Sequence, residues 1–81
     1  MSKYDLIEKL RKRENVDGLK LFRKSDNCII TIEKYTNNLH TMLEYDWKRY
    51  NNGISSGGGA VCHIANLIYM IMAGRLTILS R

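Results

Sequence analysis

The first segment with a clear hydrophobic pattern is residues 2–14. Its apolar positions fall on one side of a helix and its charges on the other; the apolar residues are Leu6, Ile7 and Leu10. Ser2 stands at a capping position, and Asp5 three residues later completes the sequence pattern of a capping box. This pattern predicts an N-terminal amphipathic helix, and Asp17-Gly18 interrupts the chain after it.

Residues 19–47 fit two patterns. Apolar spacings of three and four allow a helix, whereas the β-rich run 28–32 and the turn dipeptides Asp26-Asn27 and Asn37-Asn38 favour a three-stranded antiparallel meander. Folding the chain at both turns places Lys20 opposite Glu33 and separates two faces. The apolar face collects Leu19, Leu21, Cys28, Ile30, Ile32, Leu39, Leu43, Tyr45 and Trp47. The other, largely polar face collects Lys20, Lys24, Thr31, Glu33, His40, Glu44 and Asp46, with Phe22, Ile29, Tyr35 and Met42 among them.

The last third of the chain divides at a Gly/Ser run. Residues 48–59 are predicted as a polar connection, and residues 61–73 as a helix that Gly74 ends. This helix is apolar nearly all round, so more than one surface must cover it. The sheet is one, and the N-terminal helix or a second molecule is the other. Residues 75–81 either extend the helix or form a short edge strand.

Together these elements predict an α+β fold in a single domain, residues 1–81, in the order α-β-β-β-α, with an all-α fold as the alternative. This order resembles that of double-stranded-RNA-binding domains and of small RNase toxins with the same topology, in the order of elements alone. The RNA-binding family begins its second helix with a lysine cluster, where this chain has Gly-Gly-Gly-Ala-Val-Cys-His at 57–63. No site residue is therefore carried over from either family.

Composition narrows the class of protein. The chain has 81 residues, two cysteines and a net charge of +5. Two cysteines do not make a disulfide scaffold, and no signal peptide or membrane span is visible. We therefore expect a basic cytoplasmic protein that holds no cofactor and whose two cysteine thiols are buried and reduced.

The basic residues raise the prospect of nucleic-acid binding. Eight of the 13 lysines and arginines lie in the first 24 residues, and Lys48 and Arg49 flank Trp47 and Tyr50. Phosphate binding needs cations on one surface, with aromatic rings nearby for stacking. Acidic residues are interspersed, however, so an ordinary solvated face explains the same pattern.

Other candidate sites are weaker. Three glycines before a helix could cradle a phosphate, but 55–59 contains neither a P-loop nor a dinucleotide motif, and a flexible connector or contact loop explains it. Two cysteines and two histidines lack zinc-site spacing, so no metal is expected. Cys62 with His40 or His63 is a conceivable nucleophile pair, yet Cys62 lies in the most apolar segment. His40 beside Lys20 and Glu33 is a conceivable acid–base group. We expect no catalysis.

The sequence therefore predicts a small non-catalytic binding protein, an inhibitor or adaptor of the kind that phages and other mobile elements carry. Its partner would be a larger protein, such as a nucleic-acid-processing enzyme, and a basic nucleic-acid-binding module is the alternative. A homodimer through the C-terminal helix is also expected. The predicted contact residues are Lys9, Lys12, Arg13, Lys20, Lys24, Tyr35, Trp47, Lys48, Arg49, Tyr50, Ser55, Ser56 and Gly57.

Overall fold

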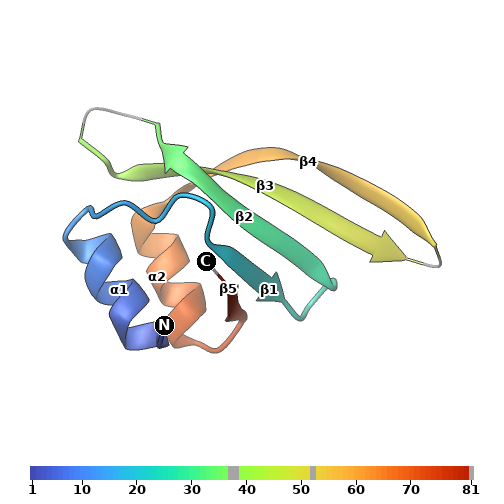
Figure 1. Cartoon of the computed structure of the whole chain (residues 1–81), viewed down its shortest axis with the longest axis horizontal. Helices are drawn as coiled ribbons and strands as arrows, with labels where there is room; N and C mark the ends of the chain where they lie inside the picture. The colour runs from blue at the N-terminus through green and yellow to red at the C-terminus, as the bar shows by residue number, and fades with distance from the viewer. Residues whose placement is uncertain (37–38, 52, 81) are drawn as a thin grey trace.

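Five antiparallel strands form one sheet, and two helices cover one of its faces. The computed structural model describes residues 1–36, 39–51 and 53–80. In chain order the elements are α1 (Lys3–Arg11), β1 (Lys20–Arg23), β2 (Cys28–Tyr35), β3 (Met42–Asn51), β4 (Ile54–His63), α2 (Ile64–Met72) and β5 (Leu76–Ser80). The strands lie in the order β4-β3-β2-β1-β5 (Figure 1). The α+β class is confirmed, and the all-α alternative is wrong. The described residues form two strands beyond the three predicted: β4, which was not expected, and β5, which was one alternative for the tail.

Helix α1 begins where the sequence predicts and ends earlier, at Arg11. The Asp5 N–H donates to the Ser2 hydroxyl at 3.2 Å, and the Ser2 N–H donates to the Asp5 carboxylate at 3.3 Å, which completes the capping box. Arg13 has a φ of 59°, a left-handed conformation that a helix cannot include. The predicted apolar face is buried: Leu6, Ile7 and Leu10.

The hairpin between β1 and β2 is confirmed, but its turn is longer than predicted. Arg23 pairs with Cys28, so residues 24–27 form the turn, and Lys20 lies opposite Thr31 instead of Glu33. Because the register moves by two residues, the side chains of the paired residues 20–23 and 28–31 keep their predicted faces. The predicted apolar positions of β2 are accordingly buried: Cys28, Ile30 and Ile32.

The pairing of β2 with β3 contains an irregularity that the sequence pattern does not reveal. The predicted Asn37-Asn38 turn lies outside the described residues. The register shifts after Ile32, and such a bulge changes which face the following residues occupy. Tyr35, predicted on the polar face, therefore packs against the core. Leu39, predicted on the apolar face, precedes β3 and is 78% exposed.

Strand β4 is the largest departure from the prediction. Of the segment 48–59, expected as a polar connection, residues 48–51 form the end of β3 and residues 54–59 form more than half of β4, and the two strands pair without a register shift. The strand includes glycines, which are depleted in strands, and the pattern therefore favoured a loop. The overlooked signal is Asn52-Gly53 in the sequence, a strong hairpin dipeptide, and Gly53 has a φ of 79°.

Helix α2 is shorter than predicted, because residues 61–63 belong to β4. It begins after His63, whose Nδ1 accepts a hydrogen bond from the Ala65 N–H at 3.0 Å. It ends before Gly74, which has a φ of 76° and turns the chain into β5. The edge-strand alternative for the tail is thus confirmed, and β5 pairs with β1.

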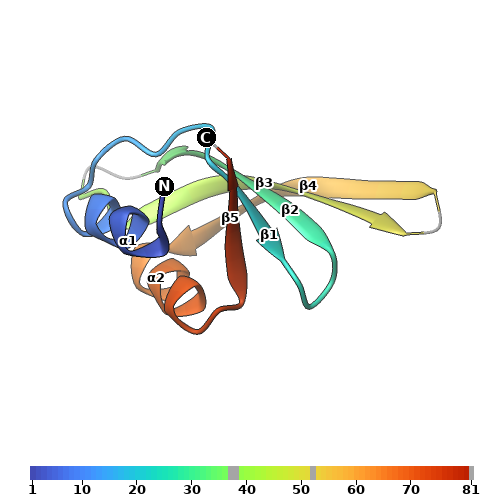
Figure 2. The same cartoon turned by 60° about the horizontal axis from the view of Figure 1, so that its bottom comes forward.

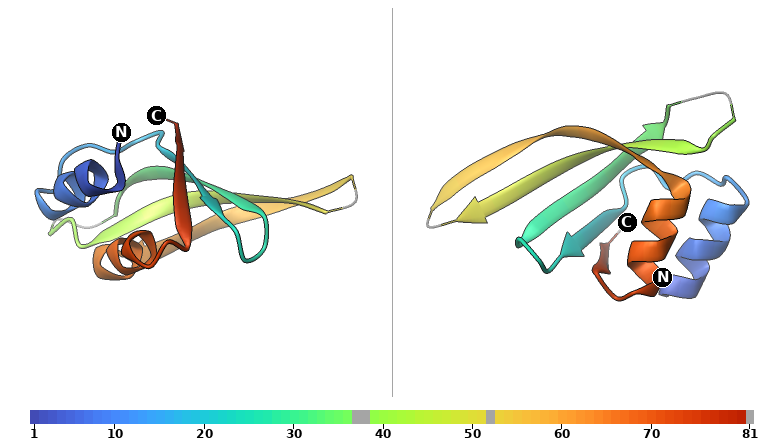
Figure 3. Two further views of the ribbon diagram at one scale, coloured as in Figure 1. Left: turned by 90° about the horizontal axis from the view of Figure 1, so that it is seen from below. Right: turned by 180° about the vertical axis from the view of Figure 1, so that it is seen from behind.

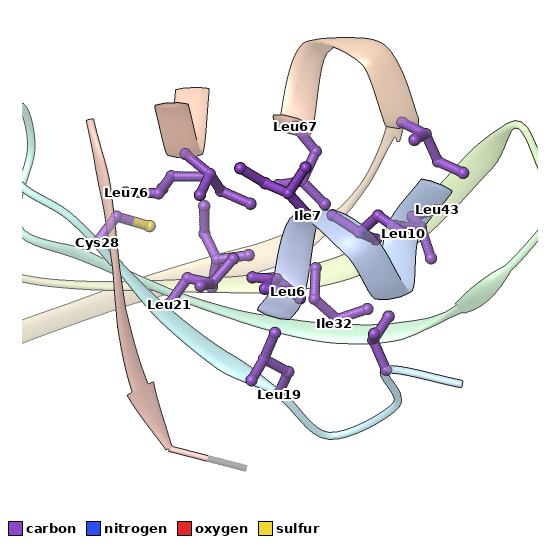
Figure 4. Packing of buried hydrophobic residues seen from close by; sticks show 14 residues of the cluster. Leu6, Ile7, Leu10, Leu19, Leu21, Cys28, Ile32, Leu43, Leu67 and Leu76 are labelled. Carbon is purple, nitrogen blue, oxygen red and sulfur yellow. The ribbon is translucent and has the colours of Figure 1, made fainter. Parts of the chain in front are cut away.

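The core lies between the sheet and the two helices. Both helices lie on the same side of the sheet (Figures 2 and 3). Apolar side chains from α1 and α2 point toward those of the sheet (Figure 4); the most deeply buried include Leu6, Leu10, Leu21, Ile32, Leu43 and Ile71. Helix α1 contacts α2 directly, so the apolar α2 is covered within the chain on two sides, and Tyr69 and Met72 stay exposed. The homodimer through this helix stays a prediction.

Candidate functional site

Strand β4 is an edge of the sheet, and half of its backbone groups point away from β3. The Gly18 N–H donates to the Ile32 carbonyl at 2.8 Å, and the Ile32 N–H donates to the Leu19 carbonyl at 2.9 Å. The backbone groups of Ile32 therefore point toward β1, and those of its neighbour Thr31 point toward β3, because the direction alternates along a strand. Carried through the pairing of β2 with β3 and of β3 with β4, this alternation directs the backbone groups of even-numbered β4 residues toward β3. The outward backbone groups consequently belong to the odd-numbered residues Ser55, Gly57, Gly59 and Val61.

The usual protections of an edge strand are missing from β4. Its ten residues, Ile54–His63, include no lysine, arginine, carboxylate or proline, and its register has no bulge. Natural sheets use these devices to prevent pairing with another chain. The opposite edge, β5, has five residues and an irregular register with β1. Of the two edges, β4 is therefore the longer and the less protected one.

Trp47 lies over β4 on the helix side of the sheet. A Cβ on Gly58 would meet the Trp47 indole Nε1 at 3.4 Å, and a Cβ on Gly57 would meet the Trp47 carbonyl oxygen at 2.7 Å. The indole is half-buried and packs against the margin of the core, on the apolar face as predicted. The glycines therefore let an aromatic ring cover the edge strand.

Arg49 joins Trp47 to an ion-pair cluster at the β1–β2 turn. Its guanidinium carbon lies 5.6 Å from the centre of the Trp47 ring, within cation–π range. Its Nη2 is 3.1 Å from the Asp26 carboxylate, which Arg23 also binds through two hydrogen bonds of 2.9 Å. The pKa of Asp26 lies below its usual value, mainly because the Arg23 side chain donates hydrogen bonds to the Asp26 carboxylate. These contacts tie β3, close to its C-terminal end, to the β1–β2 turn, just before β3 and β4 project beyond β2 (Figure 1).

The structure distributes the other predicted cations over separate surfaces. Lys9 and Lys12 belong to α1 and its C-cap, and Lys12 pairs with Glu8 at 3.2 Å. Lys20 and Lys48 lie on the sheet face that no helix covers, and Lys24 lies in the β1–β2 turn. Arg13 donates from Nη1 to the carbonyls of Leu10 and Arg11. The seven predicted cations therefore do not share one phosphate-binding surface.

The predicted aromatic contacts also separate. Tyr35 is half-buried, donates its hydroxyl to the Glu14 carbonyl at 2.8 Å and stacks on His40 with 4.8 Å between ring centres. Burial raises the pKa of the Tyr35 hydroxyl. Tyr50 is 56% exposed and lies on the opposite face of β3 from Trp47. Ser55 and Gly57 share the Tyr50 face, and Ser56 shares the Trp47 face.

The candidate chemistry at Cys62 finds no support in its surroundings. Cys62 and His63 are adjacent in β4 and thus point to opposite faces. Desolvation raises the pKa of the Cys62 thiol, which disfavours the reactive thiolate. His63 is engaged as the N-cap of α2. Among the described residues, no three His, Cys, Asp or Glu side chains are grouped as metal ligands would be.

Comparisons with known proteins add no family. Neither a protein-family model, nor a curated protein, nor a solved structure matches this chain. Within residues 1–36, 39–51 and 53–80, no helix is long and apolar enough to cross a membrane. The proposals below therefore depend on the geometry of β4 and its surroundings.

Proposed function

We propose that this chain is a small non-catalytic binding protein, an inhibitor or adaptor, that docks on a larger protein by strand addition at β4. The observation that carries the proposal is the unprotected, uncharged ten-residue edge Ile54–His63. An extended partner segment would receive main-chain hydrogen bonds from the outward backbone groups, which is a recurring mode of peptide recognition.

Side chains on both sides of β4 would give such docking its specificity. On the helix side, Gly58 leaves the Trp47 indole accessible to a neighbouring strand, and an apolar partner side chain fits there. On the other side, Tyr50 is exposed and Lys48 lies beside Gly57. The net charge of +5 favours a partner with an acidic surface, such as an enzyme that processes nucleic acid.

Nucleic-acid binding is the second candidate, and the open face of the sheet favours it. Phe22 lies there in one row with Ile29 and Lys48, and Lys20 lies two residues from Phe22. One aromatic ring between two cations is a suitable platform for a stacked base. Asp46 on the same face opposes phosphate binding, so we place this candidate second.

The two candidates are distinguished by affinity capture with a matched pair of variants. Gly59→Pro removes one outward N–H without touching the ladder with β3, whereas Gly59→Ala adds a methyl group into open space and keeps that N–H. Strand addition predicts a stoichiometric protein that wild type and Gly59→Ala retain after nuclease treatment and Gly59→Pro loses. A ligand that absorbs at 260 nm and disappears with nuclease would overturn the docking proposal.

A further inference from the structure

A second copy of this chain would bring an identical β4 edge to this one. Two identical strands that pair antiparallel form a self-complementary interface around a two-fold axis. The ten residues of β4 carry no charge that would repel their counterparts. We infer that two copies pair through β4, with Gly58 facing Gly58 of the second copy, and form one continuous ten-stranded sheet.

The charges of β3 favour this register slightly, since the Cα atoms concerned would be three strand spacings, about 14 Å, apart. With Gly58 on the axis, Gly57 faces Gly59 of the second copy. Lys48 pairs with Gly57, and Asp46 pairs with Gly59. Each Lys48 therefore lies in one row of paired residues, running across the strands, with Asp46 of the other copy. Both side chains are on the face of the sheet that no helix covers.

Neighbouring registers place like charges in one row, although an axis at Gly59 would also set Glu44, the β3 partner of Val61, in line with Lys48 of the second copy. An axis at Gly57 would place Lys48 in one row with its own counterpart, and an axis at Gly59 would do the same for Asp46. An axis between two residues would pair odd-numbered residues with even-numbered ones. Only odd-numbered residues have outward backbone groups, so such a register would lose the paired hydrogen bonds between the copies. Backbone geometry permits an axis at Gly57, Gly58 or Gly59, and of these the Gly58 axis is the one that places no like charges in one row.

On the helix side, the same register brings the two Trp47 side chains toward each other. Trp47 pairs with Gly58, and its indole lies over that glycine. The two Trp47 Cα atoms would be three strand spacings apart, about 14 Å. Each indole leans over its own glycine, so the rings would cover the junction from both sides. A foreign strand would have to supply an apolar side chain at this place, whereas a second copy already carries Trp47.

The inferred dimer uses the edge that the proposed partner needs, so dimerisation would compete with docking. It does not depend on the existence of that partner, since the argument uses this chain alone. A monomeric chain would overturn the dimer and leave the docking proposal standing. Capture of nucleic acid alone would overturn the docking proposal and leave the dimer standing.

Sedimentation equilibrium over the micromolar range tests the dimer. We expect wild type and Gly59→Ala to approach twice the monomer mass at high concentration. Gly59→Pro should raise the dissociation constant at least about 10-fold, because each copy loses a hydrogen bond to the other. Equal dimerisation of the two variants, with both folded by circular dichroism, would show that another surface associates and overturn the inference.

A second measurement keeps the test decisive if Gly59→Pro does not fold. Trp47 is the only tryptophan in the chain, so the tryptophan fluorescence of the wild-type protein reports on the surroundings of this one side chain. We expect its emission to move to shorter wavelength as the dimer forms. A monomer mass at the highest concentration, or a dimer with unchanged emission, would contradict pairing around Gly58.

Discussion

Gly57 and Gly59 offer a matched test of the way β4 packs on β3. Both are in the same strand and on the same face, and the same substitution to alanine has opposite consequences at the two positions. A Cβ on Gly57 would lie 2.7 Å from the Trp47 carbonyl oxygen, whereas a Cβ on Gly59 would meet nothing within 4 Å. The obstructing oxygen belongs to the backbone of β3, so it cannot rotate away as a side chain does.

The expected magnitudes follow from two contributions. Replacing glycine by alanine reduces the entropy of the unfolded chain and stabilises the fold by about 0.4–1 kcal/mol where the backbone permits it. Gly59→Ala should show this gain. Gly57→Ala should lose about 1–3 kcal/mol through steric overlap. Because the entropy contribution is common to both variants, their difference isolates the overlap at about 1–3 kcal/mol.

Urea and thermal unfolding at low protein concentration measure the difference without contributions from association. For a domain of this size, each 1 kcal/mol shifts the midpoint temperature by about 4–8 °C. We expect Gly57→Ala to unfold at a lower temperature than wild type and Gly59→Ala at a slightly higher one. Equal stabilities for the two variants would mean that residues 54–59 do not pack on β3 as described, and the reasoning would fail.

Three further predictions concern the rest of the fold. Ser2→Ala should lower the free energy of unfolding by about 1 kcal/mol through loss of the capping box, and unchanged urea unfolding would refute the cap. Leu21→Ala should cost about 2–5 kcal/mol, because Leu21 is fully buried at the centre of the core, and a loss below 1 kcal/mol would contradict that packing. Asp26→Asn should cost about 1 kcal/mol at neutral pH. Folding lowers the pKa of Asp26, so its stabilisation is present above the unfolded pKa and is lost as pH falls through the folded pKa; wild type and Asp26→Asn should therefore converge in acid. A difference that persists in acid would contradict the ion-pair origin.

The features that the sequence predicted correctly are those with local causes. The Ser2–Asp5 capping box and the alternation along β2 depend on nearby residues and regular geometry, and both are present. The two-residue register error between β1 and β2 preserved the faces, since side chains alternate with a period of two. The bulge after Ile32 has no pattern in residue type, so the sequence did not indicate that Tyr35 faces the core.

Strand β4 could not be predicted from residue preference, because glycine is uncommon in strands and these glycines are suited to β4 only through the space that they leave for residues of β3. Their small size matters only once Trp47 lies over Gly58 and its carbonyl lies against Gly57, and both contacts arise from the pairing of β3 with β4. The same limit applies to the site. The sequence predicted Ser55, Ser56 and Gly57 as contact residues in a loop, whereas the structure places them in an edge strand.

Residue-resolved amide hydrogen exchange along β4 tests the central claim most directly. In dilute protein we expect slow exchange at the even-numbered residues Ser56, Gly58, Ala60 and Cys62, which face β3, and fast exchange at the odd-numbered residues Ser55, Gly57, Gly59 and Val61. At high concentration, or with a bound partner strand, the odd-numbered amides should become protected as well. Odd-numbered amides that exchange fast under every condition, or that are already protected in dilute protein, would contradict an open edge that docks by strand addition.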